Sequence, residues 1–125
     1  NKFFFFKNIK KRPYITMKIA SSKDGKSHLL NSDRTYITSK ESRKDVQKLR
    51  AIHDAILTGG NTVINDAPKM NARVNFPVNQ PKKILLSSKT NFDLSADFFV
   101  DCDYEILSET DINKILKKYE GLNNM

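Results

Sequence analysis

The segment from Ile56 to Arg73, with the sequence ILTGGNTVINDAPKMNAR, holds most of the residues whose types and spacing can bind a ligand. An apolar run leads into Gly59-Gly60, where the absence of side chains allows a ligand to approach the backbone closely, although a purely structural turn is the simpler explanation. Backbone amides at such a turn can hold a phosphate, above all if a helix starts there. The following residues complete neither a Walker loop nor a dinucleotide fingerprint, so the turn alone identifies no ligand.

Three charged side chains near this segment are further candidates. Asp66 comes four residues after Thr62 and can hold a ribose hydroxyl or an amide, or can simply cap a turn before Pro68. Arg50 and Arg73 are candidate anion ligands, because a guanidinium group binds phosphate through two parallel hydrogen bonds. The alternative for Arg50 is that it belongs only to the polar face of a helix.

Lys18 is unusual because it lies within the alternating apolar segment from Tyr14 to Ala20. If its side chain is buried, the ammonium group needs a partner or a function. If the segment is an edge strand, Lys18 guards that edge against pairing with another chain. Both explanations remain open from the residues alone.

Several kinds of chemistry lack support in the sequence. Cys102 is the only cysteine, and His28 and His53 are the only histidines, so no internal disulfide can form and we expect no metal site. Cys102 stands between two aspartates, which favour an inert thiol. We find no motif for nucleophilic catalysis, no signal peptide and no apolar run long enough to span a membrane, and we expect a cytoplasmic protein.

The formal net charge of +8 is compatible with a nucleic acid or another anion as partner. The lysines are scattered, however, and lack the interleaved aromatic residues of a recognised RNA-binding motif. They are most simply explained as a solvated lysine-rich surface, and a phosphorylated small ligand would also benefit from the positive potential. The lysines concerned are Lys7, Lys10, Lys11, Lys40, Lys44, Lys48, Lys82, Lys83, Lys117 and Lys118.

The expected elements alternate between strands and helices. Residues 1–12 are expected to be a connecting segment, and residues 14–20, with Ile15, Met17 and Ile19 on one face, a strand. A turn at Asp24-Gly25 follows, and then a helix over residues 40–53, capped by Thr38 or Ser39. Further strands are expected at 55–57, 83–87, 98–100 and 104–107, with a short helical or irregular piece before Pro68.

Ser108 to Asp111 resembles a capping box, followed by a helix with Ile112, Ile115, Leu116 and Tyr119 on its apolar face and Gly121 after its end. This order predicts an α/β fold, and the expected next element after the last helix is a strand.

These segments together resemble one known family. The run RPYITMKIASSKDGK, residues 12–26, is similar to the opening of the reductase domain in bifunctional riboflavin-biosynthesis deaminase/reductases. The resemblance continues in order through residues 36–39, 43–51, 53–57, 59–63, 66–68 and Arg73, and to the strand and serines at 84–88. Residues 1–6 resemble the segment that joins the family's deaminase domain to its reductase domain. We therefore expect a linker at residues 1–12 and the N-terminal part of the reductase domain at residues 13–125.

The resemblance implies a dihydrofolate-reductase-like fold, with a mostly parallel sheet flanked by helices, of which this chain is the N-terminal portion. It implies NADPH-dependent reduction of the ribosyl group of 5-amino-6-(5-phosphoribosylamino)uracil in riboflavin biosynthesis. By motif position, the NADPH site would be lined by Ala20, Tyr36, Thr62, Asp66 and Ser88, and the substrate would meet Arg50, Met70 and Arg73. Lys18 and Asp66 would lie nearest the reacting carbon and are the expected catalytic residues. Family members also associate, so we expect a homodimer that takes a phosphorylated small molecule and no nucleic acid or membrane.

Departures from the family pattern leave other functions open. Arg34 stands where the family usually has a serine that touches substrate, Tyr36 replaces a tryptophan, and Ala67 and Ser87 replace aspartates. A substrate-binding glutamate and a Gly-rich cofactor loop of the family are not found before Met125, so this stretch alone is expected to be inactive. The alternatives are a related reductase for another pteridine or pyrimidine substrate, and a non-catalytic basic module that binds RNA or another anion.

Overall fold

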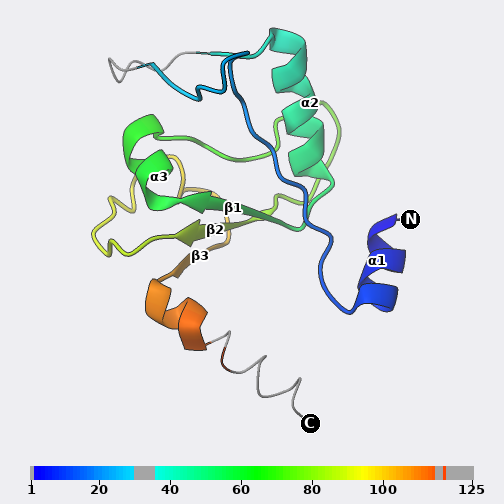
Figure 1. Cartoon of the computed structure of the whole chain (residues 1–125), viewed down its shortest axis with the longest axis vertical. Coiled ribbons are helices and arrows are strands. Elements are labelled where there is room, and N and C mark those ends of the chain that lie inside the picture. Colours follow the sequence, from blue (N-terminus) through cyan, green and yellow to red (C-terminus); the bar gives the residue numbers. More distant parts are fainter. Residues whose placement is uncertain (1, 30–35, 115–116, 118–125) are drawn as a thin grey trace. The chain divides into compact units, whose positions relative to one another are not determined.

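A computed structural model describes residues 2–29, 36–114 and 117, and these divide into two compact units, residues 1–38 and 39–125. Figure 1 shows the helices and strands, which are α1 (Lys2–Lys10), α2 (Lys40–Ala51), β1 (Ala55–Gly59), α3 (Gly60–Asp66), β2 (Lys82–Leu86) and β3 (Tyr104–Leu107). Residues 109–114 are also helical. Within the described residues, no helix is long and apolar enough to cross a membrane.

The first unit contains a helix that we did not expect. Residues 1–12 were predicted to be a connecting segment, yet α1 occupies most of it. Phe3 and Phe6, one helical turn apart, both pack edge-on against Tyr14, with ring centroids 5.1 and 5.4 Å away. This spacing of aromatic residues accounts for the helix, because side chains three positions apart share one helical face.

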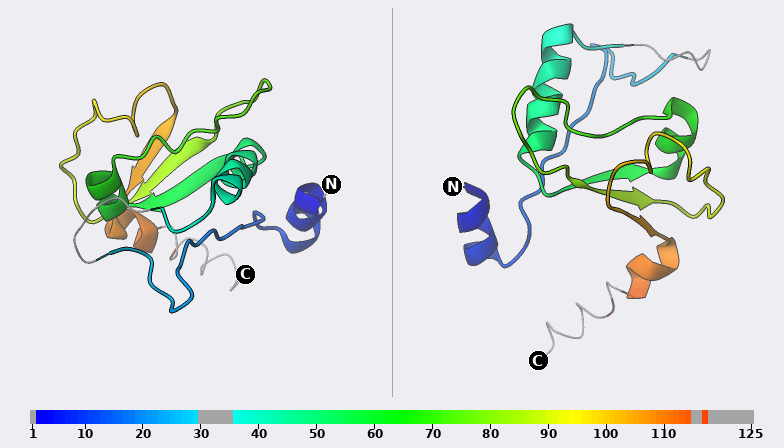
Figure 2. Two further views of the ribbon diagram at one scale, coloured as in Figure 1. Left: turned by 90° about the horizontal axis from the view of Figure 1, so that it is seen from above. Right: turned by 180° about the vertical axis from the view of Figure 1, so that it is seen from behind.

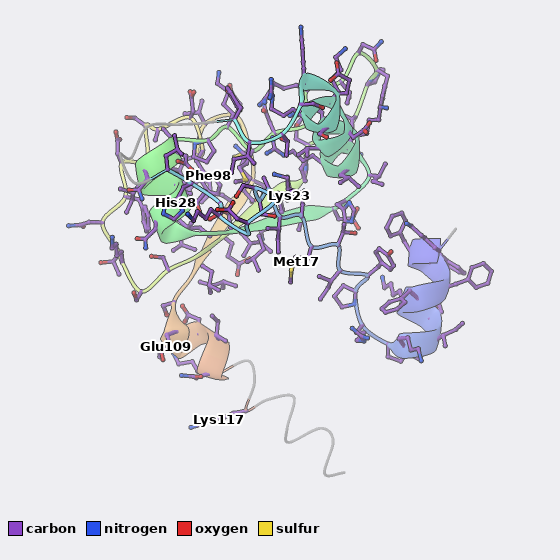
Figure 3. All side chains as sticks on the ribbon, turned by 45° about the horizontal axis from the view of Figure 1, so that its top comes forward. Met17, Lys23, His28, Phe98, Glu109 and Lys117 are labelled. Carbon is purple, nitrogen blue, oxygen red and sulfur yellow. The ribbon has the colours of Figure 1, made fainter. Side chains whose placement is uncertain are left out.

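The predicted strand at residues 14–20 was wrong. These residues form no strand, and Ile15, Met17 and Ile19 are 73%, 81% and 70% exposed; Figure 3 labels Met17. The described residues of the first unit contain no strand with which they could pair. An alternating pattern forms a strand only where a neighbour satisfies its backbone groups and covers its apolar face. The turn predicted at Asp24-Gly25 is present, with Gly25 at φ 81° and its amide donating to the Ser22 carbonyl over 2.9 Å.

The second unit contains a three-stranded parallel sheet with β2 in the middle. In Figure 1 the three arrows point the same way, and α3 follows directly from the tip of β1, an arrangement also visible in both views of Figure 2. Gly59 pairs with Leu86, and Leu86 with Leu107. The carboxyl ends of the strands therefore share one edge of the sheet.

The expected helix at 40–53 and strands at 55–57, 83–87 and 104–107 are confirmed with small shifts of their ends. Ser39 is the N-cap of α2, and its hydroxyl accepts a hydrogen bond from the Ser42 amide over 3.2 Å. The capping box at the end of β3 is also present, since Ser108 and Asp111 exchange backbone-to-side-chain hydrogen bonds in both directions. Ile112 lies in the helix that follows, whereas Ile115, Leu116, Tyr119, Gly121 and Arg34 lie outside the described residues.

The strand predicted at 98–100 was also wrong, since these residues lie in a turn. Phe98 and Phe99 are instead the centre of the core, together with Val63 and Leu85. Their rings meet edge-on with centroids 5.0 Å apart, and Phe99 meets Tyr104 at the same separation. In a half-exposed strand, consecutive side chains point to opposite faces, so only one of two neighbouring residues is buried. Phe98 and Phe99 are both buried, which fits a loop folded over the sheet.

Lys83 differs from the solvated lysine that we expected. It is 2% exposed, and its ammonium group donates to the Phe98 carbonyl over 2.6 Å and lies 5.3 Å from the centre of the Phe98 ring. Phe98 is labelled in Figure 3. Lys83 and Leu85 alternate with the more exposed Lys82, Ile84 and Leu86 along β2. The position of Lys83 on the inner face of the sheet therefore explains its burial.

Candidate functional site

Two arginines of the second unit converge on one asparagine. Arg50, in the last turn of α2, donates from Nη1 to the Asn71 carbonyl oxygen over 3.2 Å, and Arg73 donates from Nη1 to Asn71 Oδ1 over 2.8 Å. Burial and, second, the positive charge of Arg73 lower the pKa of the Arg50 guanidinium. Among the described residues, the ion pairs of this unit involve lysines and neither of these arginines. Two guanidinium groups without a carboxylate partner form a site suited to a phosphate.

The two glycines at the end of β1 have different surroundings. A Cβ on Gly60 would overlap Ser87 Oγ and lie 2.8 Å from Ser87 Cβ and 3.2 Å from Phe92 Cζ, whereas a Cβ on Gly59 would meet nothing within 4 Å. Packing therefore requires a glycine at position 60. Only Gly59 leaves open space beside the backbone, so the predicted close approach of a ligand concerns Gly59.

Two of the expected cofactor residues share the carboxyl edge of the sheet. Thr62 lies in α3, directly after β1, and Ser88 follows β2 by two residues. The loop after β2 is tied to α3, because Lys89 Nζ donates to Asn61 Oδ1 over 3.1 Å. Ligands of open parallel sheets bind at this edge, where successive loops meet.

Asp66 and Met70 flank a backbone reversal. Asp66 is the exposed last residue of α3, and Ala67 after it adopts a left-handed conformation with φ 40°. Met70 also has a positive φ of 52°, and its half-buried side chain packs against the core of Val63, Leu85 and the two phenylalanines. Core packing thus accounts for Met70, and its expected contact with substrate stays a prediction.

The remaining predicted site residues belong to the first unit. Lys18 is exposed and Ala20 is half-buried, in a segment that forms no strand, and Tyr36 is 62% exposed. Neither explanation considered for Lys18 describes this arrangement, because the side chain is neither buried nor on an edge strand. The contacts of these three residues with cofactor or substrate stay predictions.

Sequence reasoning did not find the amides that organise the arginine pair. Asn71 was passed over, as were Gln47 and Gln80, whose side chains bind the backbone of residues 72 and 73. No local pattern marks them, because the bonds of Gln47, of Gln80 and of Arg50 to Asn71 join residues eight or more positions apart. Within the part of the chain that the structure describes, no three His, Cys, Asp or Glu residues are grouped as metal ligands. Cys102 donates its thiol to the Phe98 carbonyl over 3.4 Å.

A parallel sheet in which a crossover containing α3 joins β1 to β2, and a loop joins β2 to β3, defines an α/β domain. Residues 13–121 match the model of the RibD C-terminal domain family, and the chain belongs to that family. The riboflavin biosynthesis protein RibD of Aquifex aeolicus is 43% identical over 96 residues, which are 77% of this chain and 27% of that protein. The corresponding protein of Bacillus amyloliquefaciens is 37% identical over 89 residues, which are 71% and 24% of the two chains. The chain thus spans about a quarter of the length of these relatives.

Solved structures agree with this assignment. RibD of Acinetobacter baumannii superposes with a TM-score of 0.79 at 29% identity, over 92% of this chain and 35% of that one. A deaminase/5-amino-6-(5-phosphoribosylamino)uracil reductase of Thermotoga maritima superposes with a TM-score of 0.71 at 29% identity, over 86% and 31%. The resemblance to the riboflavin-pathway family and the expected α/β fold with a parallel sheet are confirmed.

Proposed function

We propose that this chain forms the N-terminal part, residues 13–125, of a reductase domain in riboflavin biosynthesis. The proposed reaction is the NADPH-dependent reduction of the ribosyl group of 5-amino-6-(5-phosphoribosylamino)uracil. The observation that carries the proposal is the pair formed by Arg50 and Arg73. These two guanidinium groups have no carboxylate partner among the described residues, so they suit the phosphate of this substrate. The name of the Thermotoga maritima relative, a 5-amino-6-(5-phosphoribosylamino)uracil reductase, supports the same substrate.

The groups at the carboxyl edge of the sheet fit the proposed cofactor. Thr62 and Ser88 offer hydroxyl groups, and Gly59 leaves open space beside the backbone. Hydroxyls beside accessible backbone can bind the ribose and amide groups of a dinucleotide. Ala20, Tyr36 and Asp66 are the other residues that we propose to contact NADPH. When bound, NADPH supplies the hydride, and the protein orients the reactants.

Lys18 and Asp66 are the proposed catalytic residues. The Lys18 ammonium group would polarise the reacting carbonyl or protonate the developing alkoxide, and the Asp66 carboxylate would hold the nicotinamide amide or a ribose hydroxyl. Arg50, Arg73 and Met70 would position the substrate. We also propose that the protein acts in the cytoplasm as a homodimer on this small molecule.

An intact relative provides the test of these roles. In the Aquifex aeolicus protein, replacing the residues that match Lys18 and Asp66 with alanine should lower kcat for substrate-dependent oxidation of NADPH by about 100-fold or more. Unchanged turnover would remove the role from that residue. For the present chain, salt-sensitive RNA binding without NADPH binding would instead favour the basic binding module.

A further inference from the structure

The backbone between Asn71 and Arg73 is held from two sides by side-chain amides. Gln80 accepts a hydrogen bond from the Ala72 amide over 2.8 Å and donates one to the Ala72 carbonyl over 3.0 Å. Gln47, on α2, accepts from the Arg73 amide over 3.1 Å. Ala72 is only 5% exposed, so its two hydrogen bonds with Gln80 are partly sheltered from water. Residues 71 and 73 therefore occupy fixed places on either side of a clamped residue.

The helix α2 supplies both contacts on its side of this segment. Gln47 and Arg50 are three residues apart, so they lie on the same helical face. One binds the backbone of Arg73, and the other donates to the backbone of Asn71. The helix thus brings the Arg50 guanidinium to the segment that carries Arg73. Their proximity is also reflected in the lowered pKa of Arg50, to which Arg73 contributes.

Asn71 contacts both arginines through oxygen atoms that carry no formal charge. Its carbonyl oxygen accepts from Arg50, and its side-chain Oδ1 accepts from Arg73. Arg50 is half-buried and Arg73 is exposed. A carboxylate partner would orient either guanidinium but would cancel its charge. Here an amide provides the orientation, and both positive charges remain. Each guanidinium has five N–H donors, of which Asn71 takes one.

We propose that Asn71 is a positioning residue for an anion site formed by Arg50 and Arg73, and that its lack of charge reserves both guanidinium groups for a dianionic phosphomonoester. The inference rests on the proposed function, in which these arginines hold the substrate phosphate. It adds that a neutral acceptor at position 71 determines the affinity for that phosphate. Gln47 and Gln80 support the site by holding the backbone.

The test compares Asn71→Asp with two other variants of the full chain. Asn71→Asp keeps an acceptor oxygen in place and adds one negative charge, and Asn71→Ala removes the side-chain acceptor without adding charge. Asn91→Asp adds the same charge at an exposed position in the loop after β2 and serves as the matched control. Titration calorimetry with ribose 5-phosphate, and with ribose as the uncharged comparison, measures affinity at several salt concentrations. Circular dichroism checks that each variant is folded.

The wild-type chain should bind ribose 5-phosphate more tightly than ribose. Asn71→Asp should weaken phosphate-dependent binding by about tenfold or more, because a carboxylate forms the ion pairs that the phosphate would form. Its affinity should also depend less on salt, a change that a purely structural role for Asn71 would not produce. Asn71→Ala should lose affinity but keep the wild-type salt dependence, and Asn91→Asp should stay within about twofold of wild type.

One result would refute the role of Asn71 alone, and another would refute the phosphate site itself. If the wild-type chain prefers ribose 5-phosphate and Asn71→Asp keeps that affinity and salt dependence, the role of Asn71 is wrong while the phosphate site stands. If Asn71→Asp is misfolded, unchanged affinity and salt dependence in Asn71→Ala overturn the role equally. If the wild-type chain does not distinguish ribose 5-phosphate from ribose, the arginine pair is not a phosphate site, and the role of Asn71 is lost with it.

Discussion

Replacing Gly60 with alanine should destabilise the second unit, whereas the same change at Gly59 should not. The added Cβ at position 60 would overlap Ser87 Oγ and lie 2.8 Å from Ser87 Cβ. Rotation about χ1 could move the Ser87 Oγ, but the backbone fixes the Ser87 Cβ, so that contact remains. The matching position at Gly59 is open, and its φ of −88° is available to alanine.

The magnitude follows from two opposing effects at Gly60. Overpacking a filled position costs about 1–3 kcal/mol, and replacing glycine with alanine in a helix returns up to about 1 kcal/mol. We expect a net loss of about 1–2 kcal/mol for Gly60→Ala. In a chain of 125 residues this corresponds to a fall in Tm of roughly 4–8 °C. For Gly59→Ala we expect a change within about 0.5 kcal/mol.

Urea and thermal denaturation followed by circular dichroism measure these differences. The double variant Gly60→Ala/Ser87→Gly removes the atoms responsible for the overlap, so it should recover at least about 1 kcal/mol relative to the sum of the single changes. Equal stability of Gly60→Ala and Gly59→Ala would refute the packing explanation. The two glycines would then have to be considered together as ligand contacts.

Three further predictions concern the core, a helix cap and the anion site. Lys83→Ala should lower the free energy of unfolding by about 2–5 kcal/mol in urea denaturation, because it removes a buried side chain and a charge-assisted hydrogen bond to Phe98; Lys83→Met should cost less, and equal losses would contradict this reasoning. The hydrogen bonds from the side chain and backbone of Ser108 lower the pKa of Asp111, so the stability they contribute should be present near neutral pH and lost as the pH falls below about 4. Ser108→Ala should reduce this pH dependence in urea titrations, and an unchanged profile would assign it to other carboxylates. Arg50→Lys should weaken binding of ribose 5-phosphate by about tenfold in calorimetry, because lysine lacks the planar donor pair, and wild-type affinity would exclude a contact through that pair.

The sequence pattern correctly predicted the elements whose formation depends mainly on neighbouring residues. The helix α2 has a side-chain cap at Ser39, and the parallel strands are short apolar runs, so their places could be found from neighbouring residues. The segment at 14–20 shows the same alternation as a strand, but the part of the first unit that the structure describes contains no strand with which it could pair. Phe98 and Phe99 were misjudged because their burial depends on contacts with Val63 and Leu85, far away in the sequence.

The sequence indicated which arginines belong to the candidate site, but it did not indicate how their side chains are held. The resemblance to the family indicated Arg50 and Arg73, and the structure places both on Asn71. The asparagine itself could not be predicted, because its function depends on α2 meeting a loop more than twenty residues later. Lys83 is a similar case, since its neighbours in the sequence do not show that its ammonium group faces the Phe98 carbonyl.

NADPH binding is the measurement that tests the proposed reductase function most directly. Fluorescence and calorimetric titrations should be made on this chain and on a version extended through the Gly-rich cofactor loop that the resemblance to the family implies. We predict that the extended protein binds NADPH, with weaker binding after Ser88 or Thr62 is replaced by a bulky residue. Failure of both proteins to bind NADPH would contradict the proposed function and leave the anion-binding module as the explanation to pursue.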